Sequence, residues 1–243
     1  MGYVLCRGLC QPRCHQFELN TNLKIDFKNM KTWFAPLLLL VFCSSSAQQK
    51  QAVNNYSVIK TAAWIIPRTD TLDYSLDEYQ GKKALLMTRK FGNYKSASIA
   101  YPKNSNFKDG TIEADLAWQG KQGGYIGLAF RIKDAHHYQV VYFRPESSGT
   151  INAIQYMPEK KAEFNWWDYE ADKYQAKATL PLHDWFHVKL VVKGNSVTVY
   201  INNQPKPAMA YNAMDNSLQS GSVGYWLGNS EAGAFRNLVV ADN

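Results

Sequence analysis

Apolar and polar residues alternate with a period of two through much of this chain. In the segment 110–118, for example, Ile112, Ala114 and Leu116 alternate with polar residues. This period is typical of a β-strand with one face buried and the other open to solvent or ligand. The expected strands are 84–89, 96–101, 110–118, 124–132, 137–144, 150–156, 185–193, 196–201, 221–227 and 233–240.

The clearest hairpin in the sequence is the segment HVKLVVKGNSVTVYINNQ, residues 187–204. Its turn, Lys193-Gly194-Asn195, contains residue types that tight turns prefer. The expected cross-strand partners are Val188, Leu190 and Val192 on the first arm and Val197, Val199 and Ile201 on the second. Many short strands, short turns and no alternation of strands with helices predict an all-β fold, an antiparallel β-sandwich of jelly-roll type.

The first 60 residues lack this pattern. After Met30-Lys31, an apolar run from Trp33 to Cys43 is followed by small residues up to Ala47. This order is typical of a secretory signal, and the run is too short to span a bilayer stably. The expected organisation is 1–29 as a spurious or upstream extension, 30–47 as a signal peptide, 48–60 as a linker and 61–243 as a single β-sandwich domain.

The signal predicts a secreted or periplasmic protein without a transmembrane segment. Lipid attachment at Cys43 is the less favoured alternative, because Phe42 occupies a position where lipoprotein cleavage sites need a small residue. All four cysteines precede residue 48, so no disulfide is expected in the mature domain. Its stability must then come from its core.

Charge and motifs argue against several classes of function. The net charge is +7, but no run of Lys and Arg exceeds two residues, so no nucleic-acid-binding surface is expected. Cys6, Cys10 and Cys14 match no zinc spacing, and the sequence has no glycine-rich phosphate loop and no serine nucleophile motif. The histidines, including His183 and His187, lack companions at metal-ligand spacing and are expected to be ordinary surface or hydrogen-bonded residues.

Three successive strands between residues 109 and 145 carry an unusual set of side chains on their non-core positions. These are Glu113, Asp115, Arg131, Tyr142 and Arg144. Arginine and tyrosine beside paired carboxylates are more typical of a binding groove than of a solvated sheet face. The alternative is a wet face on which the two carboxylates form cross-strand ion pairs with the arginines.

Sugar recognition needs aromatic faces together with side chains that make paired hydrogen bonds. The long insertion at 157–184 supplies Trp166 and Trp167 and is expected to form a lid, although tandem tryptophans can also plug one end of a sandwich. Trp226 is a further platform, but a strand tryptophan is more often core. The predicted carbohydrate-binding residues are Arg131, Tyr142, Arg144, Gln155, Trp166 and Trp167.

The segments DGTIEADL, GYIGLAFRIKD, HYQVVYFRP and HVKLVVKGNSVTVYINNQ together resemble the concanavalin A-like lectin/glucanase superfamily. More narrowly, they resemble secreted bacterial laminin G-like and 3-keto-disaccharide hydrolase-type domains, over about residues 80–241. The resemblance implies two curved antiparallel sheets with carbohydrate bound across the concave one. The predicted function is therefore that of a secreted carbohydrate-binding protein of a bacterial glycan-use system.

Two other functions stay open. Glu113-Ala114-Asp115 matches the first half of the E-x-D-x-x-E motif of laminarinase-type relatives, so these carboxylates are candidate catalytic residues of a glycoside hydrolase or keto-glycoside-cleaving enzyme. Trp118 stands where the motif needs its third carboxylate. A laminin G-like protein-binding domain is the other alternative. The resemblance also implies a structural Ca²⁺ at Asp70 and Asp242, and no other metal or cofactor is expected.

Overall fold

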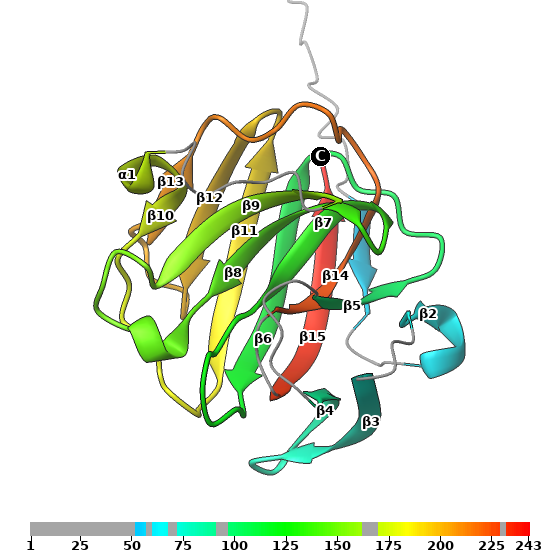
Figure 1. Ribbon diagram of the computed structural model, residues 1–243. Coiled ribbons are helices and arrows are strands. Elements are labelled where there is room, and N and C mark those ends of the chain that lie inside the picture. Colours follow the sequence, from blue (N-terminus) through cyan, green and yellow to red (C-terminus); the bar gives the residue numbers. More distant parts are fainter. Residues whose placement is uncertain (1–51, 57–59, 68–71, 91–96, 162–169, 229–231) are drawn as a thin grey trace, which may run out of the picture. The chain divides into compact units, whose positions relative to one another are not determined.

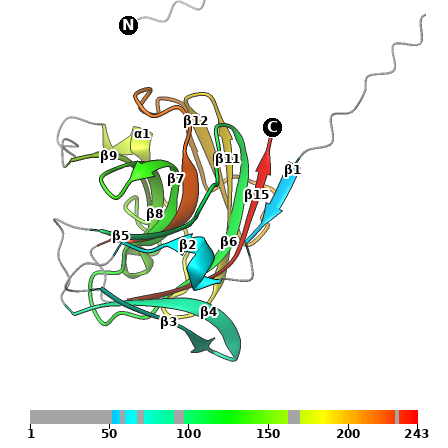
Figure 2. The same ribbon diagram turned by 90° about the vertical axis from the view of Figure 1, so that its right-hand side faces the viewer.

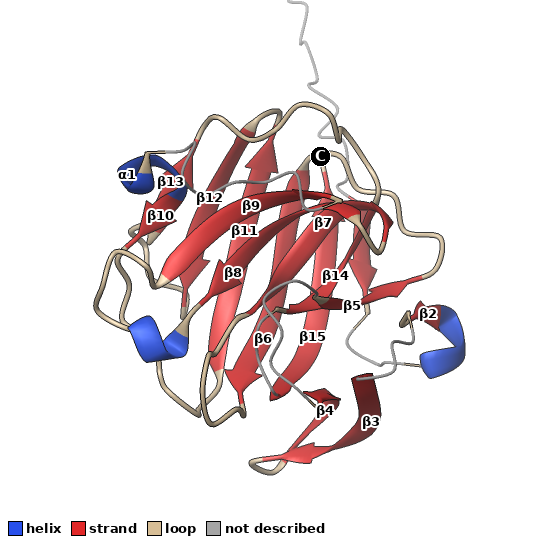
Figure 3. Ribbon diagram, in the orientation of Figure 1, coloured by secondary structure: helices blue, strands red, loops and turns tan. Residues whose placement is uncertain are grey.

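Strands dominate the structure, a computed structural model that describes residues 52–243 apart from 57–59, 68–71, 91–96, 162–169 and 229–231. The described strands form two antiparallel sheets that pack face to face (Figures 1 and 2). Helical structure in the described residues is limited to short turns at Thr61–Ala63, Pro145–Ser147 and α1 (Ala171–Tyr174), as the colouring in Figure 3 shows. The predicted antiparallel β-sandwich is confirmed.

One sheet has eight described strands, in the order β13-β12-β11-β6-β15-β4-β3, and β1 also pairs with β15. Its strands are β1 (Ala52–Asn55), β3 (Leu72–Tyr79), β4 (Lys82–Arg89), β6 (Gly110–Trp118), β11 (Phe186–Lys193), β12 (Ser196–Ile201), β13 (Met209–Tyr211) and β15 (Ala232–Asp242). We call it the eight-stranded sheet.

The other sheet has seven described strands, in the order β10-β9-β8-β7-β14-β5-β2. Its strands are β2 (Trp64–Ile65), β5 (Ser98–Pro102), β7 (Ile126–Asp134), β8 (His137–Phe143), β9 (Ile154–Lys160), β10 (Gln175–Ala176) and β14 (Ser222–Leu227). We call it the seven-stranded sheet.

The inner faces of the two sheets enclose one large apolar core. Ile112 and Leu116 of β6 and Leu128 and Phe130 of β7 are fully buried in it. The predicted hairpin is confirmed in its register: Val188, Leu190 and Val192 of β11 lie opposite Ile201, Val199 and Val197 of β12, respectively. Period-two alternation therefore identified the inward positions of this hairpin correctly.

The three strands between residues 109 and 145, whose non-core side chains were expected to line one groove, do not all belong to one sheet. β6 lies between β11 and β15 in the eight-stranded sheet, whereas β7 pairs with β8 and β14 in the seven-stranded sheet. The chain crosses from one layer to the other between β6 and β7. The outward side chains of these two strands therefore lie on opposite outer faces.

A strand also occupies part of the expected linker. β1 lies within residues 48–60 and pairs with β15 from Ala52↔Asp242 to Asn55↔Val239. The predicted signal peptide lies outside the described residues. No helix in the described part of the chain is long and apolar enough to cross a membrane.

Candidate functional site

One row of cross-strand partners runs across the outer face of the seven-stranded sheet. Its members, from β10 to β5, are Gln175, Gln155, Tyr142, Gly127, Trp226 and Ile99. The row faces outward because the chain neighbours of Tyr142 and Trp226, Phe143 and Leu227, pack in the core between the sheets. We call this set the aromatic–amide row.

Gly127 allows the two aromatic members of the row to meet. Tyr142 and Trp226 come from strands on either side of β7, yet their ring centroids are 5.1 Å apart with an interplanar angle of 29°. A Cβ atom on Gly127 would lie 2.4 Å from the Val141 carbonyl oxygen and 2.9 Å from Cβ of Tyr142. The glycine thus leaves a gap over which the rings lean toward each other.

Hydrogen bonds fix the polar ends of these side chains. The Tyr142 hydroxyl donates to Oε1 of Gln155 at 2.6 Å, and Nε2 of Gln155 donates to Oε1 of Gln175. Trp226 Nε1 donates to the Tyr138 hydroxyl at 3.0 Å. Burial raises the pKa of both tyrosines above 10, so the phenols stay neutral. The row is a rigid base, with Tyr142 only 5% and Trp226 only 4% exposed.

Two half-buried residues, Tyr125 and Arg144, lie at one end of this face. Cζ of Arg144 is 4.7 Å from the centre of the Tyr125 ring, and that ring is 5.8 Å from the Tyr142 ring. Nε of Arg144 is buried and has no hydrogen-bond partner among the described residues. This end therefore presents an aromatic ring and a guanidinium group that forms no hydrogen bond with the described residues.

The predicted catalytic carboxylates lie on the outer face of the other sheet. There His187 of β11 bridges them, with Nδ1 2.9 Å from Oδ1 of Asp115 and Nε2 3.3 Å from Oε2 of Glu113. Nζ of Lys189 lies 2.9 Å from Oε1 of Glu113, and Nδ2 of Asn237 donates to Oδ2 of Asp115 at 2.7 Å. We call these five residues the carboxylate–histidine cluster.

The electrostatics of this cluster keep Asp115 ionised, so Asp115 does not fit the role of the protonated carboxyl in a glycosidase. Burial favours the neutral form of Asp115, but hydrogen bonds from His187 and Asn237 outweigh it and lower the pKa of the carboxyl. The hydrogen bond to Asp115 raises the pKa of His187 despite partial burial. A glycosidase needs one carboxyl group held protonated, hence with a raised pKa. Cross-strand ion pairing, the alternative considered from the sequence, does occur, but with Lys189 and His187 rather than Arg131 and Arg144.

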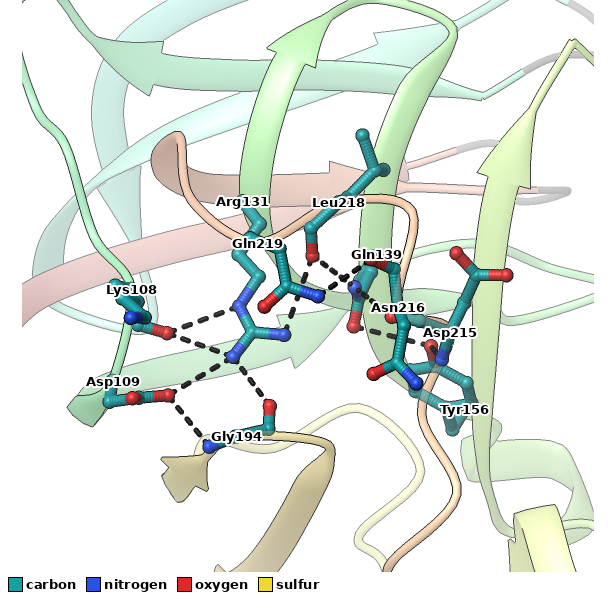
Figure 4. Close-up of polar contacts among 10 residues, drawn as sticks. All are labelled: Lys108, Asp109, Arg131, Gln139, Tyr156, Gly194, Asp215, Asn216, Leu218 and Gln219. Atoms are coloured by element: carbon teal, nitrogen blue, oxygen red, sulfur yellow. Dashed lines mark hydrogen bonds and ion pairs between the residues drawn. The ribbon is translucent and has the colours of Figure 1, made fainter.

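Arg131 does not lie on an open sheet face, which corrects its expected position. Its side chain is 1% exposed and points to one end of the sandwich (Figure 4). Nη2 donates to the carbonyl oxygens of Lys108 at 3.0 Å and Gly194 at 2.7 Å, and to Oδ1 of Asp109 at 3.1 Å. Arg131 has a positive φ of 53° where the pairing of β7 with β8 shifts register, and this bulge redirects the side chain.

A buried polar network continues from Arg131 along the same end of the sandwich. Nε2 of Gln139 donates to the carbonyl oxygens of Asp215 and Leu218, and the Tyr156 hydroxyl donates to Oε1 of Gln139 at 3.2 Å. Figure 4 shows these residues around the segment that connects β13 to β14. We call Arg131, Gln139 and Tyr156, with the groups they bind, the end network; it holds that segment against the ends of β7, β8 and β9.

The structure thus divides the predicted site residues. Tyr142, Arg144 and Gln155 share the outer face of the seven-stranded sheet, whereas Glu113 and Asp115 lie on the opposite face. Arg131 is part of the end network, and Trp166 and Trp167 lie outside the described residues.

Sequence reasoning did not include Tyr125, Gln175 or His187 in any site. The alternation that selected Tyr142 also marks Tyr125 as outward, so that signal was present in the sequence. Gln175 belongs to a two-residue strand with no pattern of its own.

The calcium site that the resemblance implies stays a prediction that the described residues do not test. They contain no group of three or more His, Cys, Asp or Glu side chains placed to hold a metal ion. Asp242 accepts a hydrogen bond from Asn54, and burial raises the pKa of its carboxyl. Asp70 lies outside the described residues.

No family model matches the chain, and no curated protein matches it. Among solved structures, it is similar to the carbohydrate-binding module CBM66 from Bacillus subtilis, with 16% identity and a TM-score of 0.51 over 72% of this chain and 93% of that one. It is also similar to a Bacillus subtilis protein of unknown function with a galectin-like fold, with 14% identity and a TM-score of 0.52 over 78% of this chain and 96% of that one. At these identities the likeness concerns the fold, and the predicted concanavalin A-like jelly roll is confirmed.

Proposed function

We propose that this protein binds carbohydrate on the outer face of its seven-stranded sheet, at the end formed by Tyr125 and Arg144. One observation carries the proposal: a half-buried guanidinium, with no acceptor among the described residues, lies over a tyrosine ring on a rigid aromatic face. The fold supports it, because a carbohydrate-binding module is among the similar structures. The buried aromatic–amide row fixes the position of the contact residues.

The chemistry of this end suits a sugar ring. The C–H face of a pyranose packs on an aromatic side chain, and its hydroxyl groups need fixed donors and acceptors. Tyr125 supplies the ring, and Arg144 supplies planar N–H donors. In the row beneath, Tyr142 is hydrogen-bonded to Gln155 and Trp226 to Tyr138, so contact residues held on it lose little freedom on binding, which favours affinity.

The binding test uses two tyrosines on opposite faces. Tyr125→Ala removes the proposed platform, whereas Tyr200→Ala removes a half-buried tyrosine from β12 of the eight-stranded sheet. A glycan array identifies ligands for the wild type, and calorimetry then measures their affinity. We expect Tyr125→Ala to weaken binding about tenfold, as loss of one aromatic contact of about 1–1.5 kcal/mol implies, and Tyr200→Ala to leave it unchanged.

Two results would overturn the proposal: no saccharide bound at millimolar concentration, or equal losses in the two tyrosine variants. The double variant Glu113→Gln, Asp115→Asn separates binding from hydrolysis at the carboxylate–histidine cluster. We expect it to bind the same saccharides as the wild type, because the cluster lies on the other sheet. Loss of a measurable glycoside-cleaving activity in this variant would instead support the enzymatic alternative.

We also propose export of the protein, which the residue order at 30–47 supports. Cleavage after Ala47 gives a mature chain that starts at Gln48. Mass spectrometry of the protein expressed in a bacterial host with its leader tests this. A mature mass starting at Gln48 supports secretion, and a lipid-modified Cys43 would show membrane anchoring instead.

A further inference from the structure

Arg144 differs from the other arginines that the structure describes. Arg89 donates to the Gly228 carbonyl oxygen at 2.5 Å, and Arg131 donates to several acceptors of the end network. Nε of Arg236 lies 3.5 Å from the Asp115 carboxylate. The side chain of Arg144 has neither an acceptor nor an ion pair among the described residues; its contact is with the Tyr125 ring. Within the part of the chain that the structure describes, this arginine is therefore half-buried without a counter-ion.

The nearest carboxylate along the chain does not fill this role. Glu146 lies two residues after Arg144, and its Oε2 accepts a hydrogen bond from the backbone N–H of Gly123 at 2.6 Å. No ion pair joins Glu146 to Arg144. Glu146 thus fixes the segment before Tyr125, and no carboxylate of the described residues forms an ion pair with the Arg144 guanidinium.

An unneutralised, partly desolvated guanidinium selects for negative charge. Water solvates it incompletely, and neutral hydroxyl groups can accept its hydrogen bonds but cannot offset its charge. A carboxylate does both, because its two oxygens match the planar fork of N–H donors. The Tyr125 ring covers one face of the guanidinium, which directs a ligand to the N–H edge.

We infer that the ligand is an acidic saccharide, with a uronate carboxylate on Arg144 and its sugar ring against Tyr125. This inference rests on the proposed function and adds the charge of the ligand to it. The carboxylate of a uronate projects from the edge of the sugar ring. The face of the ring can therefore contact Tyr125 while the carboxylate reaches the N–H edge of Arg144. Tyr125 and Arg144 then contact the ring and the carboxylate, respectively, of one sugar residue of the ligand.

The test uses a matched pair of ligands and a matched pair of variants. The ligands are an oligogalacturonate and its methyl ester, which differ in charge but not in sugar or linkage. The variants are Arg144→Gln and, as a control, Arg236→Gln, which removes the same charge from a half-buried arginine on the opposite sheet. Calorimetry is run at about 50 and 300 mM salt, because screening weakens a charge-dependent contact.

We expect the wild type to bind the acid about 10- to 100-fold more tightly than the ester, the range that charge-assisted hydrogen bonds provide. Arg144→Gln should abolish the preference, Arg144→Lys should restore part of it, and Arg236→Gln should keep it. Thermal unfolding of each variant checks that the fold is intact, and the lysine variant keeps the test valid if glutamine disturbs folding.

The possible failures are distinct. Equal binding of acid and ester by the wild type overturns the acidic-sugar inference and leaves carbohydrate binding standing. Absence of binding to any saccharide overturns the proposed function itself. A preference that survives Arg144→Gln assigns the charge recognition elsewhere, and binding of a sulfated but not a carboxylated sugar refutes the uronate.

Discussion

Replacing Arg131 with methionine should destabilise the domain strongly, although the residue contacts no proposed ligand site. Methionine keeps an unbranched, mostly apolar stem but is shorter than arginine, and it removes every donor and the positive charge. The carbonyl oxygens of Lys108 and Gly194 then lose their donor, and the Asp109 carboxylate loses its ion pair. The long 3.5 Å contact to the Leu218 carbonyl is lost as well, but such a contact contributes little.

The size of the effect follows from burial. A hydrogen bond to a charged group contributes about 1.5–3 kcal/mol, and removing one partner of a buried pair costs about 3–5 kcal/mol. Asp109 is 27% exposed and keeps a 2.8 Å hydrogen bond from Gly194 N, so its carboxylate can be solvated after the change. We therefore expect a loss of about 3–4 kcal/mol, which lowers the Tm of a domain of this size by about 6–16 °C.

Urea unfolding followed by tryptophan fluorescence, together with calorimetric melting, measures this loss. The control is Arg236→Met, since Arg236 is 25% exposed and its contact to Asp115 is 3.5 Å long, so the expected loss is below about 1 kcal/mol. A shift of the urea midpoint with an unchanged slope shows that stability alone has changed. If Arg131→Met costs no more than Arg236→Met, the end network is not a source of stability and the reasoning is refuted.

Three further predictions concern the two outer faces. The pKa of His187 is raised in the folded state, so the extra stability of the wild type over His187→Gln should be fully present below about pH 6.5. It should be lost as pH rises through the folded pKa. Melting curves from pH 5 to 9 check this, and a difference in stability that grows with pH would contradict it. The pKa of Asp115 is lowered, so its contribution should be present at neutral pH and disappear as pH falls through the folded value below 3.8; an Asp115→Asn variant that matches wild type at pH 7 would speak against it. Gly127→Ala should lower the free energy of unfolding by about 1–3 kcal/mol, because the new Cβ meets the Val141 carbonyl oxygen. It should also reduce the near-ultraviolet circular dichroism of the stacked Tyr142 and Trp226 rings. An unchanged spectrum would show that the glycine is not needed for stacking.

Alternation along the chain predicted most of the strands because the sandwich has one apolar core. The bounds of β6 and β12 coincide with the predicted 110–118 and 196–201. The edge strand β3 was not predicted, since most of its residues are exposed and no apolar face marks it. The buried strands therefore predict the fold class, whereas an exposed edge strand such as β3 shows no alternation from which it could be predicted.

The candidate site was only partly predictable for two physical reasons. Alternation separates inward from outward residues, but it does not state which sheet a strand joins, so Glu113 and Tyr142 were placed together although they lie on opposite faces. The bulge at Arg131 interrupts the alternation of β7, and no glycine or proline in the sequence there indicates a bulge. The direction of this side chain could therefore not be predicted. Tyr142, Arg144 and Gln155 were grouped correctly because β8 and β9 are regular neighbours.

The places of β14 and β15 in the two sheets govern when the protein can assemble. These strands come last in the described chain, yet β15 lies between β6 and β4, and β14 lies between β7 and β5. Until both have been synthesised, β6 and β7 each lack a neighbour, and the edges they expose are suited to pairing with other chains. A nascent chain therefore cannot build the domain in stages from its N-terminal end. Assembly must follow synthesis, and any truncation that reaches residues 222–242 removes a central strand rather than a peripheral one.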